Sequence, residues 1–183
     1  MSERDLPALL TQAWDILAEG VRDARSPARI VAFATVGAEG PEARMIALRA
    51  ADPDAATLDL HTDAGTAKLR EVERDPRGAV LVWHPERQIQ LRLRGEVAVH
   101  ARTDEAREAW AGVPDAQRWN YGAVPSPGDP IREPDAFERR EDFDGFALLR
   151  LAVREIDVVS LTEPHRRALY RRADTFAGTW LSP

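Results

Sequence analysis

Between residues 30 and 99 the sequence alternates strand-like segments with short turns, and this spacing limits the folds that the chain can adopt. Each segment is rich in β-branched or other apolar residues and is bounded by Gly, Pro or Asp. The segments lie at residues 30–36, 43–49, 57–62, 79–83 and 88–99. Turns of a few residues join antiparallel neighbours, whereas parallel strands need a crossover of about a dozen residues or more. The pattern therefore predicts a mainly β fold, a closed antiparallel β-barrel with peripheral helices, rather than a parallel sheet.

Helical periodicity flanks and interrupts these strands. Apolar residues recur at three- and four-residue steps in the first part of the chain, which indicates an amphipathic helix. Helices are predicted from residue 6 to 22–24, over 66–74 and over 103–111. Residues 113–144 are rich in Pro, Gly, Asp and Arg, and a loop of this length is usually functional or lies at an interface. Further strands are predicted at 146–153, which residues 156–161 either continue or follow as a separate strand, and at 166–172.

Composition excludes several classes of function. Hydrophobic residues make up 44% and charged residues 31% of the chain, a balance typical of a soluble globular protein, and we expect one domain over residues 1–183. There is no cysteine, so disulfides, thiolate metal sites and cysteine nucleophiles are excluded. The formal net charge of -6 argues against broad binding to nucleic acid or to anionic membranes. No apolar run approaches the ~20 residues that cross a bilayer, and we expect a cytoplasmic protein.

Three segments carry polar residues that a plain barrel does not need. The first is the strand that bears Arg44 and Arg49. The second is Arg87–Gly95, in which polar and apolar residues alternate. Within it, the amide of Gln88 can both donate to and accept from the edge of a heteroaromatic ring. These residue types suit an anionic or heteroaromatic ligand.

A third polar segment, His61–Lys68, combines a strand end, a turn of small residues and a helix start. The N-terminus of a helix presents free N–H groups and a partial positive charge, which suits a phosphate. Thr66 is a plausible N-cap that adds a hydroxyl, and Lys68, the only lysine of the chain, adds a point charge.

Taken one at a time, these residues have ordinary structural explanations. Arginines on barrel strands are most often solvated or ion-paired, and we expect Arg92 and Arg94 to lie on a solvent or interface face. A threonine such as Thr66 is most often a helix cap, and a lone histidine such as His61 is more often structural than catalytic. The order and spacing of the segments together are more specific than any one of them.

In that order and spacing, the chain resembles the pyridoxamine 5'-phosphate oxidase superfamily, especially its small oxidase-related, FMN-binding branch. The family's Arg-x-Val-x-Leu-(Lys or Arg) strand is matched by Arg44-Met45-Ile46-Ala47-Leu48-Arg49, and its aromatic-Thr-Asn/Asp turn with a Ser/Arg/Lys helix start is matched in part by His61-Thr62-Asp63 and Thr66-Ala67-Lys68. Further along, the family has an Asn-Pro, resembled by Asp75-Pro76, and an Arg-Gln strand leading to Gly, matched by Arg87-Gln88 and Gly95. Near its C-terminus the family has an Arg followed by an aromatic residue, resembled by Arg167 and Tyr170. A Trp and a Leu-x-Pro then follow, resembled by Trp180 and Leu181-Ser182-Pro183. The resemblance covers residues 30–99 well and the C-terminus loosely.

The resemblance implies an FMN-binding split barrel that works as a homodimer, with two FMN molecules at the subunit interface and a small-molecule substrate. By motif position, Arg44, Thr66 and Lys68 would bind the FMN phosphate. His61, Thr62 and Gln88 would contact the ribityl chain or the ring. The isoalloxazine would lie along the backbone of Met45, Ile46, Ala47, Leu48 and Arg49. Arg167 would approach the edge of the ring. No catalytic side chain and no metal ligand is implied, because the flavin carries the chemistry.

The sequence departs from the family pattern in three places. One is a strand-end Trp that authentic oxidases use near the flavin, in place of which this chain has Val159 or Leu161. The family usually carries an additional Arg just before the lysine of the phosphate site, but Gly65 and Ala67 stand at the corresponding positions. The Tyr, Arg and Ser that hold the substrate phosphate in authentic oxidases have no match in 110–118, which argues against pyridoxamine phosphate as the substrate. The segment 113–144 could instead build a different pocket, in which Trp119 and Tyr121 either stack on a ring or pack on the barrel.

Three functions therefore stay open. The first is an FMN-dependent oxidoreductase of unknown substrate. The second is a non-catalytic FMN carrier or flavin-sensing module. The third is a split barrel that binds another anionic cofactor, such as a nucleotide or haem.

Overall fold

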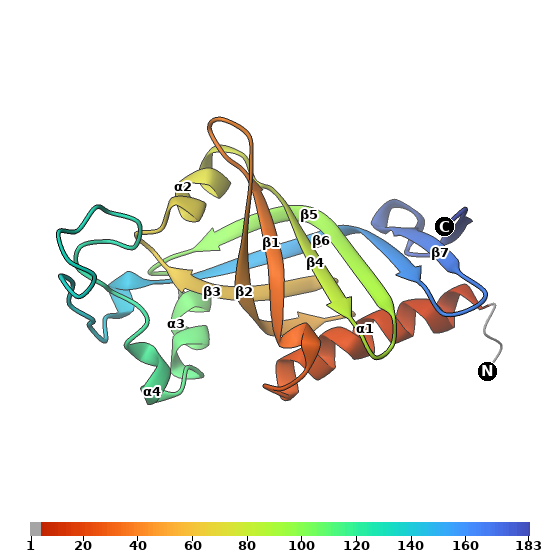
Figure 1. The fold of residues 1–183 in the computed structure, drawn as a ribbon, viewed down its shortest axis with the longest axis horizontal. Coiled ribbons are helices and arrows are strands. Elements are labelled where there is room, and N and C mark those ends of the chain that lie inside the picture. The colour runs from red at the N-terminus through yellow and green to blue at the C-terminus, as the bar shows by residue number, and fades with distance from the viewer. Residues whose placement is uncertain (1–4) are drawn as a thin grey trace.

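Six strands close into an antiparallel barrel in the computed structural model, which describes residues 5–183 (Figure 1). The barrel strands are β1 (Ile30–Val36), β2 (Pro41–Asp52), β3 (Thr57–Asp63), β4 (Arg77–His84), β5 (Ile89–His100) and β6 (Phe146–Ser160). They are hydrogen-bonded in the order β3-β2-β1-β4-β5-β6, and an additional antiparallel pairing between β3 and β6 closes the ring. The prediction of a mainly β, closed antiparallel barrel is confirmed.

Two short strands, β7 (Arg166–Arg171) and β8 (Thr179–Leu181), extend the sheet from β6 beyond the barrel. The sequence leaves open whether residues 156–161 continue the strand at 146–153 or form a separate one, and the structure has one continuous β6. Opposite β5, the register shifts between Arg94 and Gly95, and Arg154 is the extra residue of the bulge. This extra residue shifts the alternation of buried and exposed positions, so the pattern looks like two separate strands.

Alternate residues of each strand fill the barrel, as the two-residue period of a strand requires. On β5, Leu91 and Leu93 are buried, whereas Arg92 and Arg94 beside them lie on the outer face, as expected. The buried side chains that point into the barrel from the other strands are Val31, Phe33, Leu48, Leu58, Leu60, Val80, Val82, Leu149 and Leu151. These side chains form one continuous core.

Helix α1 (Leu6–Arg22) lies along the barrel on the lower side of Figure 1 and buries one apolar face against it. The buried residues of that face are Leu9, Ala13, Ile16 and Leu17. A short 3-10 helix, η1 (Pro27–Arg29), then leads into β1. The helix ends at Arg22, within the range that the sequence predicts.

Helix α2 (Ala67–Arg74) packs on β1 and β5 at the other end of the barrel. Its small apolar face consists of Leu69 and Val72, which are both buried. Thr66 precedes the helix as predicted, but its side chain does not cap it: the Oγ1 hydroxyl donates to the carbonyl oxygen of Asp63 at 2.9 Å. The hydroxyl therefore faces the β3–α2 turn.

A second, smaller core lies beneath the segment that joins β5 to β6. This segment holds α3 (Asp104–Ala111), α4 (Asp115–Arg118) and the 3-10 helix η2 (Phe143–Gly145). Tyr121 is buried against Trp110 and Phe146, with ring centroids 5.8 Å and 5.0 Å away. Trp119 is exposed. Of the two loop aromatics, Tyr121 packs on the barrel.

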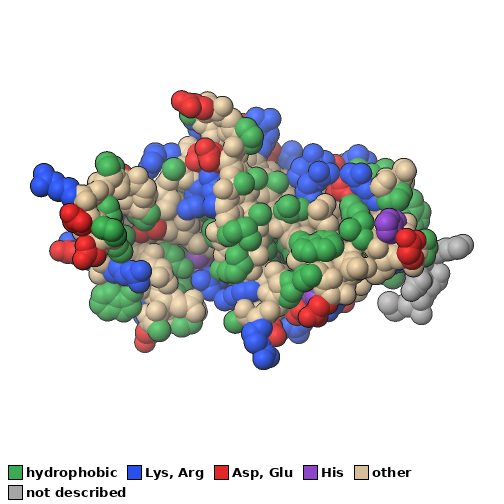
Figure 2. Space-filling model, viewed as in Figure 1, with side chains coloured by type: hydrophobic (Ala, Val, Ile, Leu, Met, Phe, Trp, Pro, Cys, Tyr) green, Lys and Arg blue, Asp and Glu red, His purple; other side chains and the backbone are tan. Residues whose placement is uncertain are grey.

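The outer face of β2, β1 and β4 carries large apolar side chains in water. Ile30, Met45, Leu81 and Trp83 are all exposed, and Ala32 lies between Met45 and Leu81 in the strand register. Figure 2 shows hydrophobic side chains gathered over these strands in the middle of the molecule. We call Ile30, Met45, Leu81 and Trp83 the outer apolar face. Within residues 5–183, the helices are all too short or too polar to cross a bilayer.

Candidate functional site

Four of the predicted ligand-binding residues meet where β2, β3 and α2 come together. Lys68 Nζ donates to Thr62 Oγ1 at 3.0 Å, and the hydroxyl oxygens of Thr62 and Thr66 lie 3.4 Å apart. Arg44 reaches the same place from β2 and interacts electrostatically with Lys68. We call Arg44, Thr62, Thr66 and Lys68 the cradle. It combines two cations and two hydroxyl groups beside the N-terminus of an eight-residue helix.

The cradle is partly shielded from water, and this changes its electrostatics. Burial lowers the pKa of Lys68, and the positive charge of Arg44 lowers it further, whereas Glu71 and Asp63 oppose the shift. An additional anion would stabilise the protonated form of Lys68. The cradle therefore favours a negatively charged ligand.

Arg44 is held in place by residues that the sequence analysis did not identify. Its Nη1 donates to Thr35 Oγ1 at 2.5 Å, and its Nη2 donates to Glu71 Oε2 at 2.8 Å. Burial alone would raise the pKa of Glu71, but the hydrogen bond from Thr35 and the charge of Arg44 outweigh it and lower that pKa. Glu71 lies three residues after Lys68 on α2, and this helical spacing was the signal that could have revealed it.

Asp63 shapes the turn that presents Thr66 and Lys68. Its Oδ1 accepts from the backbone N–H of Gly65 at 2.7 Å, and its Oδ2 accepts from those of Gly122 at 2.7 Å and Ala123 at 3.3 Å. One carboxylate thus joins the cradle turn to the long β5–β6 segment. The sequence around Asp63 does not predict this contact, because the partners Gly122 and Ala123 lie about 60 positions away.

The long segment also explains the glycine in the cradle turn. A Cβ atom at Gly65 would lie 2.6 Å from Ser126 Oγ, which is closer than side chains pack. Residue 65, one of the two positions at which the family's additional arginine could stand, therefore has space for a side chain only if Ser126 moves.

A cavity of about 240 Å³ lies beside Arg49 and His61. Its lining is formed by Val21, Arg29, Arg49, His61, Gly112, Val113, Pro114 and Gln117. Arg49 Nε is buried and has no hydrogen-bond partner among the described residues. Arg29 differs, because its Nη1 donates to the carbonyl oxygens of Val21 at 3.0 Å and Leu48 at 3.3 Å. The cavity therefore has two cationic side chains, one of which carries an unsatisfied donor.

His61 is neutral near pH 7 in this environment. Burial lowers its pKa to about 4, and the nearby charge of Arg49 contributes in the same direction, against a smaller opposing effect of Asp59. Its ring packs edge-on against Phe146, with the ring centroids 4.9 Å apart. A neutral imidazole can donate one hydrogen bond and accept another.

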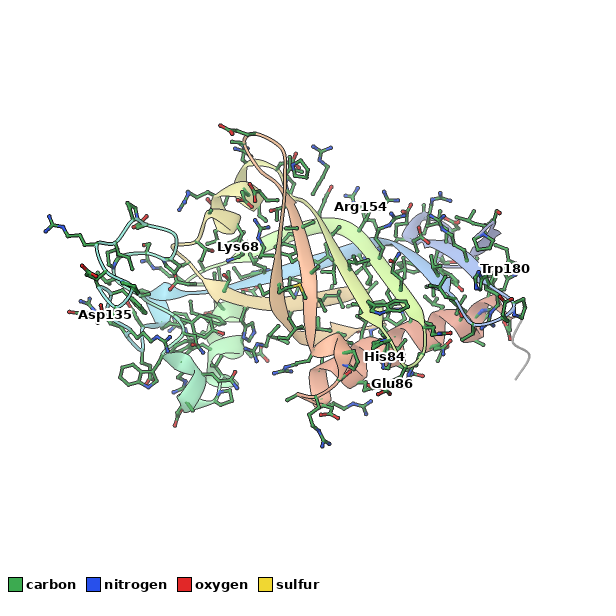
Figure 3. All side chains as sticks on the ribbon, in the orientation of Figure 1. Lys68, His84, Glu86, Asp135, Arg154 and Trp180 are labelled. Carbon is green, nitrogen blue, oxygen red and sulfur yellow. The ribbon has the colours of Figure 1, made fainter. Side chains whose placement is uncertain are left out.

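Gln88 and Arg167 lie away from the cradle in the same chain. Gln88 is in the β4–β5 turn with φ of 49°, and its backbone N–H donates to Pro85 at 3.2 Å. Figure 3 shows this end of β4, marked by His84 and Glu86, well separated from Lys68 beside α2. Arg167 on β7 donates to Asp157 from Nη2 at 2.8 Å and from Nε at 3.1 Å.

Strand β2 runs between the cradle and the cavity, and its side chains point alternately to the two faces of the sheet. Leu48 and Ile46 face the barrel interior, and Met45 is exposed on the outer apolar face. The register of β2 with β3 shifts between Leu48 and Ala50, which sets Arg49 at a bulge. Ala47 is half-buried and pairs with Ile30 of β1.

No group of acidic residues and histidines in the described part of the chain is arranged to hold a metal ion.

Comparisons with known proteins identify related sequences and folds. A family model described as pyridoxamine 5'-phosphate oxidase matches residues 17–160. A pyridoxamine 5'-phosphate oxidase-related, FMN binding protein from Nostoc punctiforme PCC 73102 has a similar structure, with a TM-score of 0.76 and 25% identity over 94% of this chain and 96% of that chain. The curated proteins include no match to this sequence.

Two further solved structures share the fold. PhzG from Burkholderia lata 383, in complex with tetrahydrophenazine-1-carboxylic acid, aligns with a TM-score of 0.74 and 22% identity over 97% of this chain and 92% of that chain. A heme binding protein from Mycobacterium smegmatis aligns with a TM-score of 0.55 and 17% identity over 87% of this chain and 59% of that chain. At these identities the likeness concerns the fold alone.

Proposed function

Because the chain belongs to the pyridoxamine 5'-phosphate oxidase family, we propose that it is an FMN-dependent oxidoreductase in which two copies of the chain hold two FMN molecules between them. The observation that carries this proposal is the cradle, in which Arg44, Lys68 and two threonine hydroxyls converge at the start of α2. A phosphate dianion needs about two cationic partners together with hydroxyl or backbone N–H donors. The residues present therefore fit the phosphate of FMN.

The strand from Met45 to Arg49 would hold the isoalloxazine ring. It runs from the cradle residue Arg44 to the cavity beside Arg49 and His61. Arg29 and Arg49 line this cavity, and their positive charges suit an anionic or hydrogen-bond-accepting group of a ligand there. Thr62 and His61, at the end of β3, would contact the ribityl chain or the ring.

A second copy of the chain would complete the site. Arg167 belongs to β7, which Figure 1 shows on the opposite side of the molecule from α2, and Gln88 belongs to the distant β4–β5 turn, whereas the resemblance assigns both residues to the flavin. The outer apolar face of Ile30, Met45, Leu81 and Trp83 suits a self-complementary contact, because exposed apolar patches often mark interaction sites. We propose that Gln88 and Arg167 of one copy approach the flavin of the other.

When bound, FMN would accept and pass on a hydride or electrons. The protein residues would bind and orient it. Arg44 and Lys68 would neutralise the phosphate, and Arg167 would place a positive charge near the ring edge. His61 would act as a neutral hydrogen-bonding group, since burial keeps its pKa near 4.

The substrate would be a small molecule with an acidic group. Arg29 and Arg49 line the cavity next to the proposed ring position, and two cations there favour a carboxylate or a phosphate. The proposal does not extend to pyridoxamine phosphate, because the side chains that hold it in authentic oxidases have no match in residues 110–118.

The visible absorption spectrum of the purified protein tests the proposal, followed by identification of the cofactor released on heating. We expect a flavin spectrum and released FMN. Lys68→Ala and Arg44→Ala should each weaken FMN binding without unfolding the barrel. Unchanged FMN affinity in both variants would rule out the cradle as the phosphate site.

The same preparation separates the open alternatives. A protein that binds FMN but is not reduced by nicotinamide donors or by candidate substrates would be a carrier or sensing module. A protein that takes up no added FMN but binds a nucleotide or haem would be a barrel with another anionic cofactor.

A further inference from the structure

Glu71 places a carboxylate inside the residues proposed to hold a phosphate. Its Oε2 accepts from Thr35 Oγ1 at 2.5 Å and from Arg44 Nη2 at 2.8 Å. The Glu71 side chain is only 13% exposed. Because Arg44 also donates to Thr35 Oγ1, the three side chains form a closed triangle around one anionic oxygen. The guanidinium of Arg44 thus already faces an anion that belongs to the protein.

This carboxylate reduces the positive charge that a ligand meets. Arg44 and Lys68 supply two positive charges, Glu71 removes one of them, and Ala67 before Lys68 adds none. Asp63 is also close enough to affect Lys68, but both of its oxygens accept hydrogen bonds from backbone N–H groups of the surrounding turns. A phosphate dianion would therefore meet a net charge of about +1 from these residues rather than +2.

We propose that Glu71 acts as a built-in counter-anion that limits the preference of this site for a phosphate-bearing flavin over riboflavin. The inference rests on the proposed function and deepens it, since Glu71 would determine which flavin the cradle selects. Two like charges a few Å apart in a partly buried site repel much more strongly than they do in water. The repulsion acts on the phosphate of FMN, and riboflavin, which lacks the phosphate, does not experience it.

The test is the affinity of flavin-free full-length protein for FMN and for riboflavin, measured by quenching of flavin fluorescence. Glu71→Gln keeps the length of the side chain and an oxygen that can accept from Arg44 and Thr35, but removes the charge. We expect it to bind FMN about tenfold more tightly and riboflavin with unchanged affinity. Glu71→Met is a second uncharged variant of similar length and should shift the FMN affinity in the same direction.

Glu73→Gln is the matched control. Glu73 lies on the same helix, two residues after Glu71, and its side chain is exposed. It removes the same charge outside the triangle, so we expect little change in affinity for either flavin. Urea denaturation of each variant verifies that the barrel is folded.

Each result decides the proposal. A selective gain of about threefold or more for FMN in Glu71→Gln or Glu71→Met, absent from Glu73→Gln, supports it. A smaller gain, an equal gain for riboflavin, or an equal gain in Glu73→Gln overturns it. If neither Glu71 variant folds, the unaltered protein decides: an FMN preference over riboflavin below about a hundredfold supports the proposal, and a larger one contradicts it. If no variant binds either flavin, the proposed function fails and this inference fails with it.

Discussion

His61 is a single residue whose environment gives the folded protein a specific response to acid. In the folded state burial lowers its pKa to about 4, from an ordinary value of 6.5. Between these two values the unfolded chain binds a proton that the folded protein does not bind. The free energy of unfolding should therefore fall as the pH falls from about 6.5 to 4, by up to about 3 kcal/mol from this residue.

His61→Phe isolates this effect, because phenylalanine keeps a ring against Phe146 and cannot be protonated. Urea unfolding of the flavin-free protein at pH 7 and pH 5 should show a larger loss of stability in the unaltered protein than in the variant. The carboxylates are the same in both proteins, so their titration cancels in the comparison. Equal losses would show that His61 is not held neutral by burial.

Asp63 supports a second prediction at the scale of one residue. Asp63→Ala removes the acceptor for the backbone N–H groups of Gly65 and Gly122, and these groups lose their partner in a partly buried turn. We expect a loss of about 1–3 kcal/mol in the free energy of unfolding, together with weaker FMN binding, because the same turn positions Thr66 and Lys68.

Asp63→Asn is the control for that change. Its amide keeps one acceptor oxygen, so it should lose less stability than Asp63→Ala. A fully stable Asp63→Ala variant would show that the turn is held by other contacts.

The residues in and around the cradle differ in how far their contacts could be predicted from the sequence. The pairing of Lys68 with Thr62 follows from local spacing, because the residues flank one short turn. Asp63, by contrast, contacts residues about 60 positions further along the chain. Glu71 was overlooked because an acidic residue on an amphipathic helix normally faces water.

At the scale of elements, the packing of α1 against η1 depends on one glycine. A Cβ atom at Gly20 would lie 2.4 Å from the carbonyl oxygen of Ala28. Replacing Gly by Ala within a helix normally stabilises by about 1 kcal/mol. Here a clash with backbone atoms should cost about 1–3 kcal/mol and exceed that gain. Gly20→Ala should therefore lower the urea midpoint of unfolding.

Gly112→Ala is a control for this prediction. Its φ is -84°, and an added Cβ would meet Ala109 at an ordinary contact distance of 3.5 Å. We expect the unfolding midpoint of Gly112→Ala to stay close to that of the unaltered protein. If Gly20→Ala were equally stable, α1 would have to shift freely on the barrel.

Most elements could be predicted because their patterns are local. The strands from Ile30 to Val99 match the periodicity of the sequence within a few residues. The exceptions depend on distant partners. The bulge at Arg154 is set by pairing with β5, and the packing of Tyr121 needs Trp110 and Phe146. Periodicity in a single segment does not contain this information.

At the scale of the whole molecule, the proposed site requires two copies of the chain. The Lys68 cradle and the Arg167 ion pair with Asp157 belong to different parts of one chain. Arg92 also donates to Asp157, at 2.5 Å, so two arginines share one buried carboxylate on this part of the sheet. Burial would raise the pKa of Asp157, but Arg167 and Arg92 outweigh it and keep the carboxylate ionised. The charged group borders the outer apolar face through the pairing of Arg92 with Leu81.

Leu81→Glu tests whether the outer apolar face joins two copies. Leu81 is exposed, so a glutamate there should leave the stability of one chain almost unchanged. Two glutamates brought to a shared apolar contact would be desolvated, and we expect a shift from dimer to monomer in light scattering. FMN binding should weaken in parallel, because Gln88 and Arg167 would no longer reach the flavin of the other copy.

Val124→Glu is the control: Val124 is an exposed apolar residue of the long β5–β6 segment, and this variant should change neither the dimer nor FMN binding. A Leu81→Glu variant that stays dimeric would place the interface elsewhere, and a monomer with full FMN affinity would show that one chain holds the cofactor alone.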